Sequence, residues 1–261
     1  MKTVTREQIA FDLRLGGIRR GDVIFMHSAL SSIGHVEGGA DAVIDAVLDV
    51  IGREGTFAVS TMSFNNPFDA ENDPSTVGII SETHRHRADS IRSLRPVHCI
   101  NAIGARAKEL TENHELCETN CGIGSPYLKL RDMHAKIVML GVDLNRNTTM
   151  HAIEDIMDAV YLIDRTIPAP KYMPDYQHKT MVMRKFCPGH RNFIGFTPVL
   201  RRAEALIEIC IGNANVKIID VAKMFDIGEE LLRKDPLAFL CTNENCDHCA
   251  PVRRAWAQKE G

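Results

Sequence analysis

The stretch that decides the fold is KIVMLGVDLNRNTTMHAIEDIMD, residues 136–158. It opens with a short run of β-branched and large apolar residues (137–142), which is typical of a strand buried on both faces of a sheet. Turn residues follow, and Asn147 or Thr148 can cap a helix that begins near Thr149. The stretch therefore predicts a central strand, a polar turn and a helix in succession.

Two residues with chemical potential open that helix. His151 and Glu154 are three residues apart and so lie on one helix face. An imidazole beside a carboxylate, following the carboxyl end of a central strand, stands where α/β proteins place their chemistry. The alternative, that both side chains simply face solvent, stays open on spacing alone.

Composition sets the broad class. The chain has 261 residues, 44% of them hydrophobic and 25% charged, which suits an ordinary globule with a large core. A net charge of -3 gives no reason to expect a nucleic-acid partner. No apolar run has membrane-spanning length, and the first residues lack a signal sequence. Together with eight scattered cysteines, these features predict reduced thiols, a cytoplasmic location and no membrane partner.

The first two thirds of the chain alternates strand and helix patterns, which predicts an α/β fold. We expect a single domain over residues 1–261, with a core at about 5–240 and a cysteine-containing tail at 241–261. A strand ending in a segment such as MVMRKF (181–186) follows the prolines at 168 and 170. Helical stretches at 198–211 and 220–234 then predict a C-terminal helical lobe beside a central mixed sheet.

Histidines outside the central helix raise a second class, a metal-dependent hydrolase. His84 and His86 are two residues apart, so on a helix they point in different directions, and we interpret them as solvated side chains. His98 and Cys99 are neighbours in an extended segment and face opposite sides. Cys99 is therefore interpreted as a small core residue and not as a nucleophile.

The tail cysteines leave a structural metal site as an alternative. Cys187-x-x-His190 and Cys246-x-x-Cys249 together have the spacing of a zinc site. The pairs are far apart in the sequence, and the other interpretation has His190 facing the active cleft while the tail cysteines bind nothing. We predict no metal in the active site.

Five stretches taken together resemble the antibiotic N-acetyltransferase family, whose best-known members are aminoglycoside 3-N-acetyltransferases. They keep the family order and cover nearly the whole chain: MHSALSSIGHVEGGADAVIDAVLDVIGREGTF, RSLRPVHCINAIG, CGIGSPYLKL, VMLGVDLNRNTTMHAIED and DPLAFL. The resemblance implies a single α/β domain that differs from the common N-acetyltransferase (GNAT) fold. It also implies acetyl-CoA as donor and the 3-amino group of an aminoglycoside deoxystreptamine ring as acceptor.

The resemblance also implies roles for individual residues. His151 matches the family's catalytic histidine and Glu154 the acid one turn later. The pantetheine arm of CoA is expected along the loop after the first strand and beside the Arg-Ser pair, at His27, Ser28, Ala29, Leu30, Ser31, Ile33, Arg92 and Ser93. Substrate contacts are expected from Asn65, Asp69, His98, Asp155 and His190.

Departures from the family pattern concern the acceptor side. The family usually has histidine where Arg95 stands and serine where Cys99 stands. Some members have a supporting aspartate after the second strand, where this chain has Asn65 with Asp69 further along. The carboxylate that orients His151 therefore stays open at this point.

The predicted reaction is direct acetyl transfer with His151 as general base. An imidazole, with a reference pKa of about 6.5, suits removal of a proton from an alkylamine whose reference pKa is about 10.4. The partner would be a small, polycationic amine; a homodimer is left open. Alternatives are a same-family acetyltransferase for another amine, a CoA-binding module without activity, and the metal-dependent hydrolase.

Overall fold

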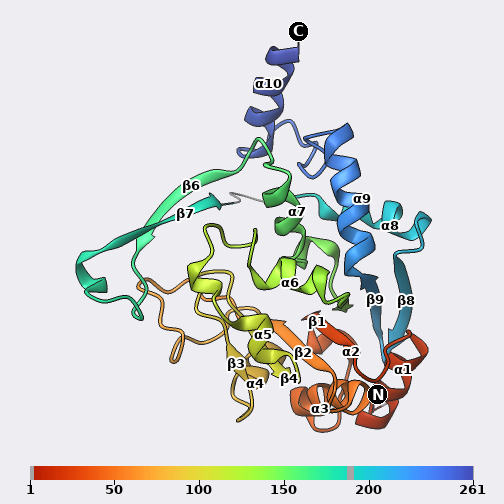
Figure 1. The fold of residues 1–261 in the computed structure, drawn as a ribbon. Coiled ribbons are helices and arrows are strands. Elements are labelled where there is room, and N and C mark those ends of the chain that lie inside the picture. Colours follow the sequence, from red (N-terminus) through yellow and green to blue (C-terminus); the bar gives the residue numbers. More distant parts are fainter. Residues whose placement is uncertain (1–2, 187–190, 261) are drawn as a thin grey trace.

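A mixed β-sheet forms the centre of the protein (Figure 1). The computed structural model describes residues 3–186 and 191–260. Its seven-stranded sheet has the order β3-β4-β2-β1-β5-β9-β8. The strands are β1 (Val23–Ser28), β2 (Thr56–Ser60), β3 (Ile91–Arg92), β4 (Ile100–Gly104), β5 (Lys136–Leu140), β8 (Leu206–Ile211) and β9 (Ala214–Asp220).

Strand β1 is the centre of the sheet. It pairs in parallel with β2 on one side and with β5 on the other, with Ser28 opposite Leu140. The outer pairings, β2 with β4 and β5 with β9, are antiparallel. Parallel strands need cover on both faces, and the apolar sequences of β1 and β5 supply buried side chains to both. The central strand predicted at 137–142 is thus confirmed as β5.

Helices cover each face of this sheet and produce two core clusters. Ile24 and Met26 of β1 point into one cluster, whereas Val23 and Phe25 point into the other. The first face is covered by α1 (Arg6–Leu15), α2 (Leu30–Ile33), α3 (Gly39–Ile51) and α4 (Ile79–Arg85). The second is covered by α5 (Ala107–Thr111), α6 (Pro126–Asp132), α7 (Met150–Ile156), α8 (Thr197–Arg202) and α9 (Val221–Lys234).

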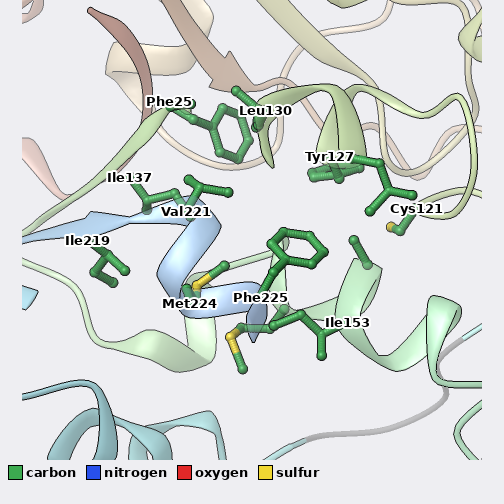
Figure 2. Packing of buried hydrophobic residues seen from close by; sticks show 14 of the residues in the cluster. Phe25, Cys121, Tyr127, Leu130, Ile137, Ile153, Ile219, Val221, Met224 and Phe225 are labelled. Carbon is green, nitrogen blue, oxygen red and sulfur yellow. The ribbon is translucent and has the colours of Figure 1, made fainter. Parts of the chain in front are cut away.

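The second face holds the larger aromatic cluster. Figure 2 shows Phe25 of β1, Tyr127 of α6 and Phe225 of α9 converging on this layer. The centroids of the Phe25 and Tyr127 rings lie 6.0 Å apart in an edge-to-face arrangement. This layer fixes α7 against the sheet through Ile153, which is fully buried in the same cluster. Short 3-10 helices at His114–Leu116, Leu144–Arg146, Tyr176–His178 and Phe193–Phe196 connect these elements.

A separate hairpin stands beside the main body. Strands β6 (Ile163–Pro168) and β7 (Thr180–Phe186) form a two-stranded sheet of their own, which extends away from the helices in Figure 1. The strand expected at 181–186 is confirmed by β7. At the other end of the chain, α10 (Cys249–Glu260) projects from the top of the view in Figure 1.

One sequence prediction for the last third of the chain was wrong. Residues 198–211 were expected to be helical, but they form the short helix α8 and then strand β8. Residues 206–211 (LIEICI) are rich in β-branched side chains, and the turn at Gly212–Asn213 returns the chain into β9. The helix expected at 220–234 is confirmed as α9, capped by Asp220, whose carboxylate accepts from Lys223 N. The last third therefore adds two strands to the central sheet as well as helices.

The fold class is confirmed as α/β with a central mixed sheet flanked by helices. Within residues 3–186 and 191–260, no helix has both the length and the apolar character that crossing a bilayer requires. The parallel strands β2, β1 and β5 end at one edge of the sheet, and the segments that follow them are the ones that carry the candidate site residues.

Gly141 offers a test of how tightly the end of β5 is packed. Its φ is +68°, and a Cβ added there would lie 1.7 Å from Ser32 Oγ. We expect Gly141→Ala to lower the free energy of unfolding by about 2–5 kcal/mol, from left-handed strain plus overpacking. Urea denaturation measures this loss.

Gly21 is the matched control. Its φ is +84°, but an added Cβ would meet nothing within 4 Å. Gly21→Ala should therefore lower the free energy of unfolding by strain alone, about 1–2 kcal/mol. Equal losses in the two variants would show that packing against Ser32 does not matter.

Candidate active site

The turn after β5 positions the histidine singled out by the sequence. Leu140 ends the strand, and Asn147 Oδ1 accepts a hydrogen bond from Thr149 N at 3.1 Å just before α7 begins at Met150. Of the two capping residues predicted, Asn147 is the one whose side chain bonds the backbone here. His151 therefore sits in the first turn of α7, at the edge of the sheet where the parallel strands end.

His151 and Glu154 form a tight pair. His151 Nδ1 lies 2.6 Å from Glu154 Oε2, and the side chains are 22% and 0% exposed. An ionised carboxylate can only accept, so Nδ1 carries the proton and donates it to Glu154. The unprotonated nitrogen of the neutral ring is then Nε2. This geometry identifies Glu154 as the carboxylate that orients His151, which the sequence had left open.

Arg191 completes the pair from the other side. Its Nε donates to Glu154 Oε1 at 2.6 Å, and its guanidinium lies 4.5 Å from the centroid of the Tyr161 ring. Burial by itself raises the pKa of Glu154, but the His151 hydrogen bond and the charges of His151 and Arg191 outweigh it and lower this pKa to about 2. Glu154 is therefore ionised at neutral pH although it is fully buried.

Aromatic rings enclose His151. The ring centroids of His98 and Phe193 lie 5.9 Å and 5.4 Å from that of His151. Burial lowers the pKa of His98 to about 3, so His98 is neutral. Asn120 Nδ2 lies 3.2 Å from His98 Nδ1, and Arg95 Nε donates to Asn120 Oδ1 at 2.7 Å. Because Asn120 is oriented by Arg95 and donates to Nδ1, His98 carries its proton on Nε2.

A cavity of about 600 Å³ opens beside the end of β1. Four of the residues expected to contact CoA, Ser28, Ala29, Leu30 and Ser31, line it. Ile33 is 1% exposed and packs in the core beneath the loop. The rest of the wall comes from the residues before α3 and the start of α4: Gly34, His35, Val36, Gly39, Gly78, Ile79 and Ile80.

The other three predicted cofactor residues do not line this cavity. Burial lowers the pKa of His27 to about 3, and its Nε2 has no hydrogen-bond partner among the residues that the structure describes. Arg92 donates to the carbonyls of Ala70, Asp73 and Thr61 and so fixes the loop after β2. Ser93 is buried and bonds His114 Nδ1. Their contact with CoA stays a prediction.

Asp155 lies at a second cavity of about 820 Å³, between the end of α7 and the β6–β7 hairpin. Its backbone carbonyl accepts from Lys185 Nζ at 3.0 Å, and burial raises the pKa of its carboxyl group. Four carboxylates and three cations line this cavity: Glu118, Asp155, Asp158, Asp164, Arg184, Lys185 and Lys259.

The remaining predicted substrate residues lie elsewhere. Asn65 Nδ2 donates to Asp73 Oδ1 at 2.9 Å, and Asp69 binds Lys171 Nζ at 3.1 Å, within and beside the loop after β2. The structure therefore brings His98 close to His151 but divides Asp155 from Asn65 and Asp69. His190, like Cys187, lies outside the described residues.

Two interpretations of single residues can be checked directly. Cys99 is 0% exposed, and burial raises the pKa of its thiol, as expected for a core residue. His84 and His86 do point apart, but the prediction of two solvated histidines was wrong for His84. That ring is 0% exposed and bonds Asn101 Oδ1, because the apolar face of α4 turns it onto the sheet beside Phe57.

Sequence reasoning missed Arg191 and Asn120. Arg191 is 37 residues from Glu154, and Asn120 is 22 residues from His98. No local spacing signals such pairs, since they are created only when the segments after α5 and β7 pack around α7.

The fold and the pair at its edge define an α/β protein with a buried imidazole–carboxylate site beyond its parallel strands. A sequence profile described as aminoglycoside 3-N-acetyltransferase matches residues 25–233. The chain belongs to this family, which confirms the resemblance seen in the sequence.

Known relatives agree with this assignment. Aminoglycoside N(3)-acetyltransferase VII of Streptomyces paromomycinus is 32% identical over 180 residues, which cover 60% of this chain and 62% of that enzyme. The match thus spans less than two thirds of that relative's length. Two solved structures share the fold. AAC-IIIb bound to CoASH has a TM-score of 0.80 at 24% identity and covers 93% of this chain and 100% of its own. AAC(3)-IVa in complex with a gentamicin has a TM-score of 0.90 at 22% identity, covering 97% and 98%.

The buried carboxylate predicts a pH-dependent stability difference between the wild type and Glu154→Gln. The folded-state pKa of Glu154 is lowered from 4.5 to about 2, so its stabilisation is complete above pH 4.5 and is lost as the pH falls toward 2. At pH 7 the variant should be less stable by about 3 kcal/mol, since each pKa unit is worth about 1.4 kcal/mol.

Thermal unfolding of both proteins between pH 7 and pH 3 measures this difference. The gap in Tm should shrink steadily below pH 4.5. Glu230→Gln is the control, because Glu230 pairs with Lys234 on the surface of α9 and is 62% exposed. A gap for Glu154→Gln that stays constant with pH would mean that Glu154 is not an ionised partner in the folded state.

Proposed function

We propose that this chain transfers an acetyl group from acetyl-CoA to an amino group of an aminoglycoside, at the 3-position of its deoxystreptamine ring, with His151 as general base. The observation that carries the proposal is the orientation of His151: Glu154 binds Nδ1 at 2.6 Å and leaves Nε2 to accept a proton. The family, and the activity in the relatives' names, support the choice of reaction.

The cavity beside β1 suits the donor. Its wall is built from small side chains and backbone between Ser28 and Gly39, which admits a thin, flexible arm. Helix α3 begins at Gly39 on the same wall, so its positive end favours a phosphate group nearby. AAC-IIIb, with the same fold, is known with bound CoASH. When bound, acetyl-CoA would supply the thioester carbonyl and the thiolate leaving group.

His151 then acts on the acceptor. An alkylamine with a pKa of about 10.4 is mostly protonated at neutral pH and cannot attack a carbonyl until it loses a proton. The Nε2 atom of His151 takes this proton as the N–C bond forms, and the imidazolium can return it to the departing sulfur. Glu154 stabilises the imidazolium, and Arg191 holds Glu154 in place. Positioned base catalysis of this kind is worth about 10²–10⁴-fold.

The negative oxygen that develops at the carbonyl needs hydrogen-bond donors. Thr149 Oγ1 is buried at the start of α7 and has no hydrogen-bond partner within residues 3–186 and 191–260. The backbone N–H groups of the turn at 28–30 form the other candidate. Such donors, when fixed in advance, contribute about 2.7–4 kcal/mol each.

The transfer is direct, without an acetyl-enzyme. Cys99 is the thiol nearest in sequence to His98, but it is 0% exposed and donates its S–H to Thr61 O at 3.0 Å. Burial raises the pKa of this thiol, so the reactive thiolate is disfavoured. A mechanism with both substrates bound together follows from these properties.

The acceptor side carries more carboxylates than cations. Four acidic and three basic side chains line the cavity at Asp155, and Asp69 adds a carboxylate in the loop after β2. A polycationic amine suits such a surface. AAC(3)-IVa, which shares the fold, binds a gentamicin. A screen of aminoglycosides against small amines, read by CoA release, decides between this acceptor and another amine.

We expect His151→Ala to reduce kcat by at least about 100-fold while the affinity for CoA changes little, because the imidazole acts in proton transfer. Thiol release during turnover and calorimetric titration with CoA measure the two quantities. His86→Ala is the control, since His86 is 63% exposed and bonds only Glu82 and Arg85 among the described residues.

Wild-type turnover in His151→Ala would refute the general base. Acetylated Cys99, found by mass spectrometry after mixing the protein with acetyl-CoA, would refute direct transfer.

The donor site has its own test. Ser31→Trp places a large ring in the cavity of about 600 Å³, so it should weaken CoA binding by about tenfold or more. Lys108→Trp, on the exposed side of α5, is the matched control and should leave the affinity unchanged. Unaltered CoA binding by a folded Ser31→Trp protein would place the donor elsewhere.

A further inference from the structure

Three cysteines near the end of the chain come together in space. Cys241 follows the short segment after α9, Cys246 lies in the next turn, and Cys249 begins α10. All three Sγ atoms lie within 4.8 Å of one another, and each residue is at most 9% exposed. The sequence pattern drew attention to Cys246 and Cys249 but not to Cys241.

The local backbone holds the sulfur atoms in this arrangement. Cys246 N donates to Asn243 O and Ala250 N to Cys246 O, which closes a turn at the entry to α10. Cys249 N donates to Cys246 Sγ at 3.2 Å. An N–H group pointing at sulfur stabilises a thiolate, because it places a positive dipole beside the developing charge. The turn therefore prepares Cys246 as a metal ligand.

The surroundings suit a structural role. The cysteines belong to a small hydrophobic cluster separate from the two main cores, with Tyr161, Leu237 and Leu240 among its members. Arg253 of α10 donates to the carbonyls of Cys241, at 2.9 Å, and Leu240, at 2.7 Å. A cluster of this size buries little apolar surface, and small units of this kind are commonly held together by a metal or a covalent link.

We propose that Cys241, Cys246 and Cys249 bind one structural Zn²⁺ ion. Three thiolates select a soft or borderline metal, and zinc is the usual partner of such sets. Ligands about 2.3 Å from a tetrahedral zinc ion are about 3.8 Å apart, which the observed spacing allows with small side-chain shifts. The fourth position is filled by a further protein donor or by water.

Binding needs no oxidant or reductant. Each of the three thiols loses its proton to solvent, and the resulting thiolates donate electron pairs to the ion. The three negative charges and the ion leave a net charge of -1, which a neutral fourth ligand keeps unchanged. The positive charge of Arg253 on the neighbouring carbonyls partly offsets it.

The bound ion would also steady the candidate active site. The segment between α9 and Cys241 carries Phe239, whose carbonyl accepts from Asn192 N at 2.9 Å. The ring centroid of Phe239 lies 5.4 Å from that of Phe193, which in turn packs against His151. A metal at the cysteines therefore fixes one wall of the His151 environment from behind.

The direct test is the metal content of the full chain, expressed without a histidine tag and purified without chelators. Inductively coupled plasma mass spectrometry should find about one zinc per chain. Cys241→Ser and Cys246→Ser should each bring this ratio well below one. Cys210→Ser is the matched control, because Cys210 is an exposed thiol on β8, and it should leave the ratio unchanged.

A second measurement needs no variant. Replacement of zinc by Co²⁺ should give sulfur-to-cobalt charge-transfer absorption with the intensity of at least three thiolates, and chelation should lower the Tm of the wild type. Wild-type protein that is free of zinc and gives no such absorption would overturn the proposal. So would a disulfide between two of the three cysteines, found by alkylation and mass spectrometry of protein kept from air.

Discussion

The hydrogen bond between His151 and Glu154 is the interaction on which the candidate site depends. Glu154 is fully buried, and a buried carboxylate is tolerated only when donors surround it. His151 supplies one donor and Arg191 another, from a segment that follows the β6–β7 hairpin. The same contact that keeps the carboxylate ionised also fixes which nitrogen of His151 carries the proton. Stability and chemical function therefore share one pair of atoms.

The rest of the fold serves to hold α7 at the edge of the sheet. Parallel pairing of β5 with β1 brings the turn after Leu140 next to the loop after Ser28. Aromatic packing of Tyr127 and Phe225 behind α7 prevents the helix from moving away from the sheet. The donor cavity and His151 consequently lie along the same strand ends although they are more than a hundred residues apart in the sequence.

Local sequence patterns predicted the features that depend on neighbouring residues. The apolar run at 137–142 and the polar turn before Thr149 gave the strand and the helix start, and the i,i+3 spacing gave the His151–Glu154 pair. Features that need distant segments were missed, such as Arg191 on Glu154 and Cys241 beside Cys249. The pattern at 206–211 was misread because apolar residues of a short edge hairpin imitate a helical period.

The arrangement of the sheet also has a consequence for synthesis on the ribosome. Strand β5 pairs with β1 as soon as both have been made, but its other edge is covered only by β9, with Leu140 opposite Val216. A growing chain that has reached the hairpin therefore carries a long apolar strand with an unsatisfied row of backbone amides and carbonyls. Until residues 214–220 emerge, that open edge is the place where nascent copies are most apt to associate wrongly.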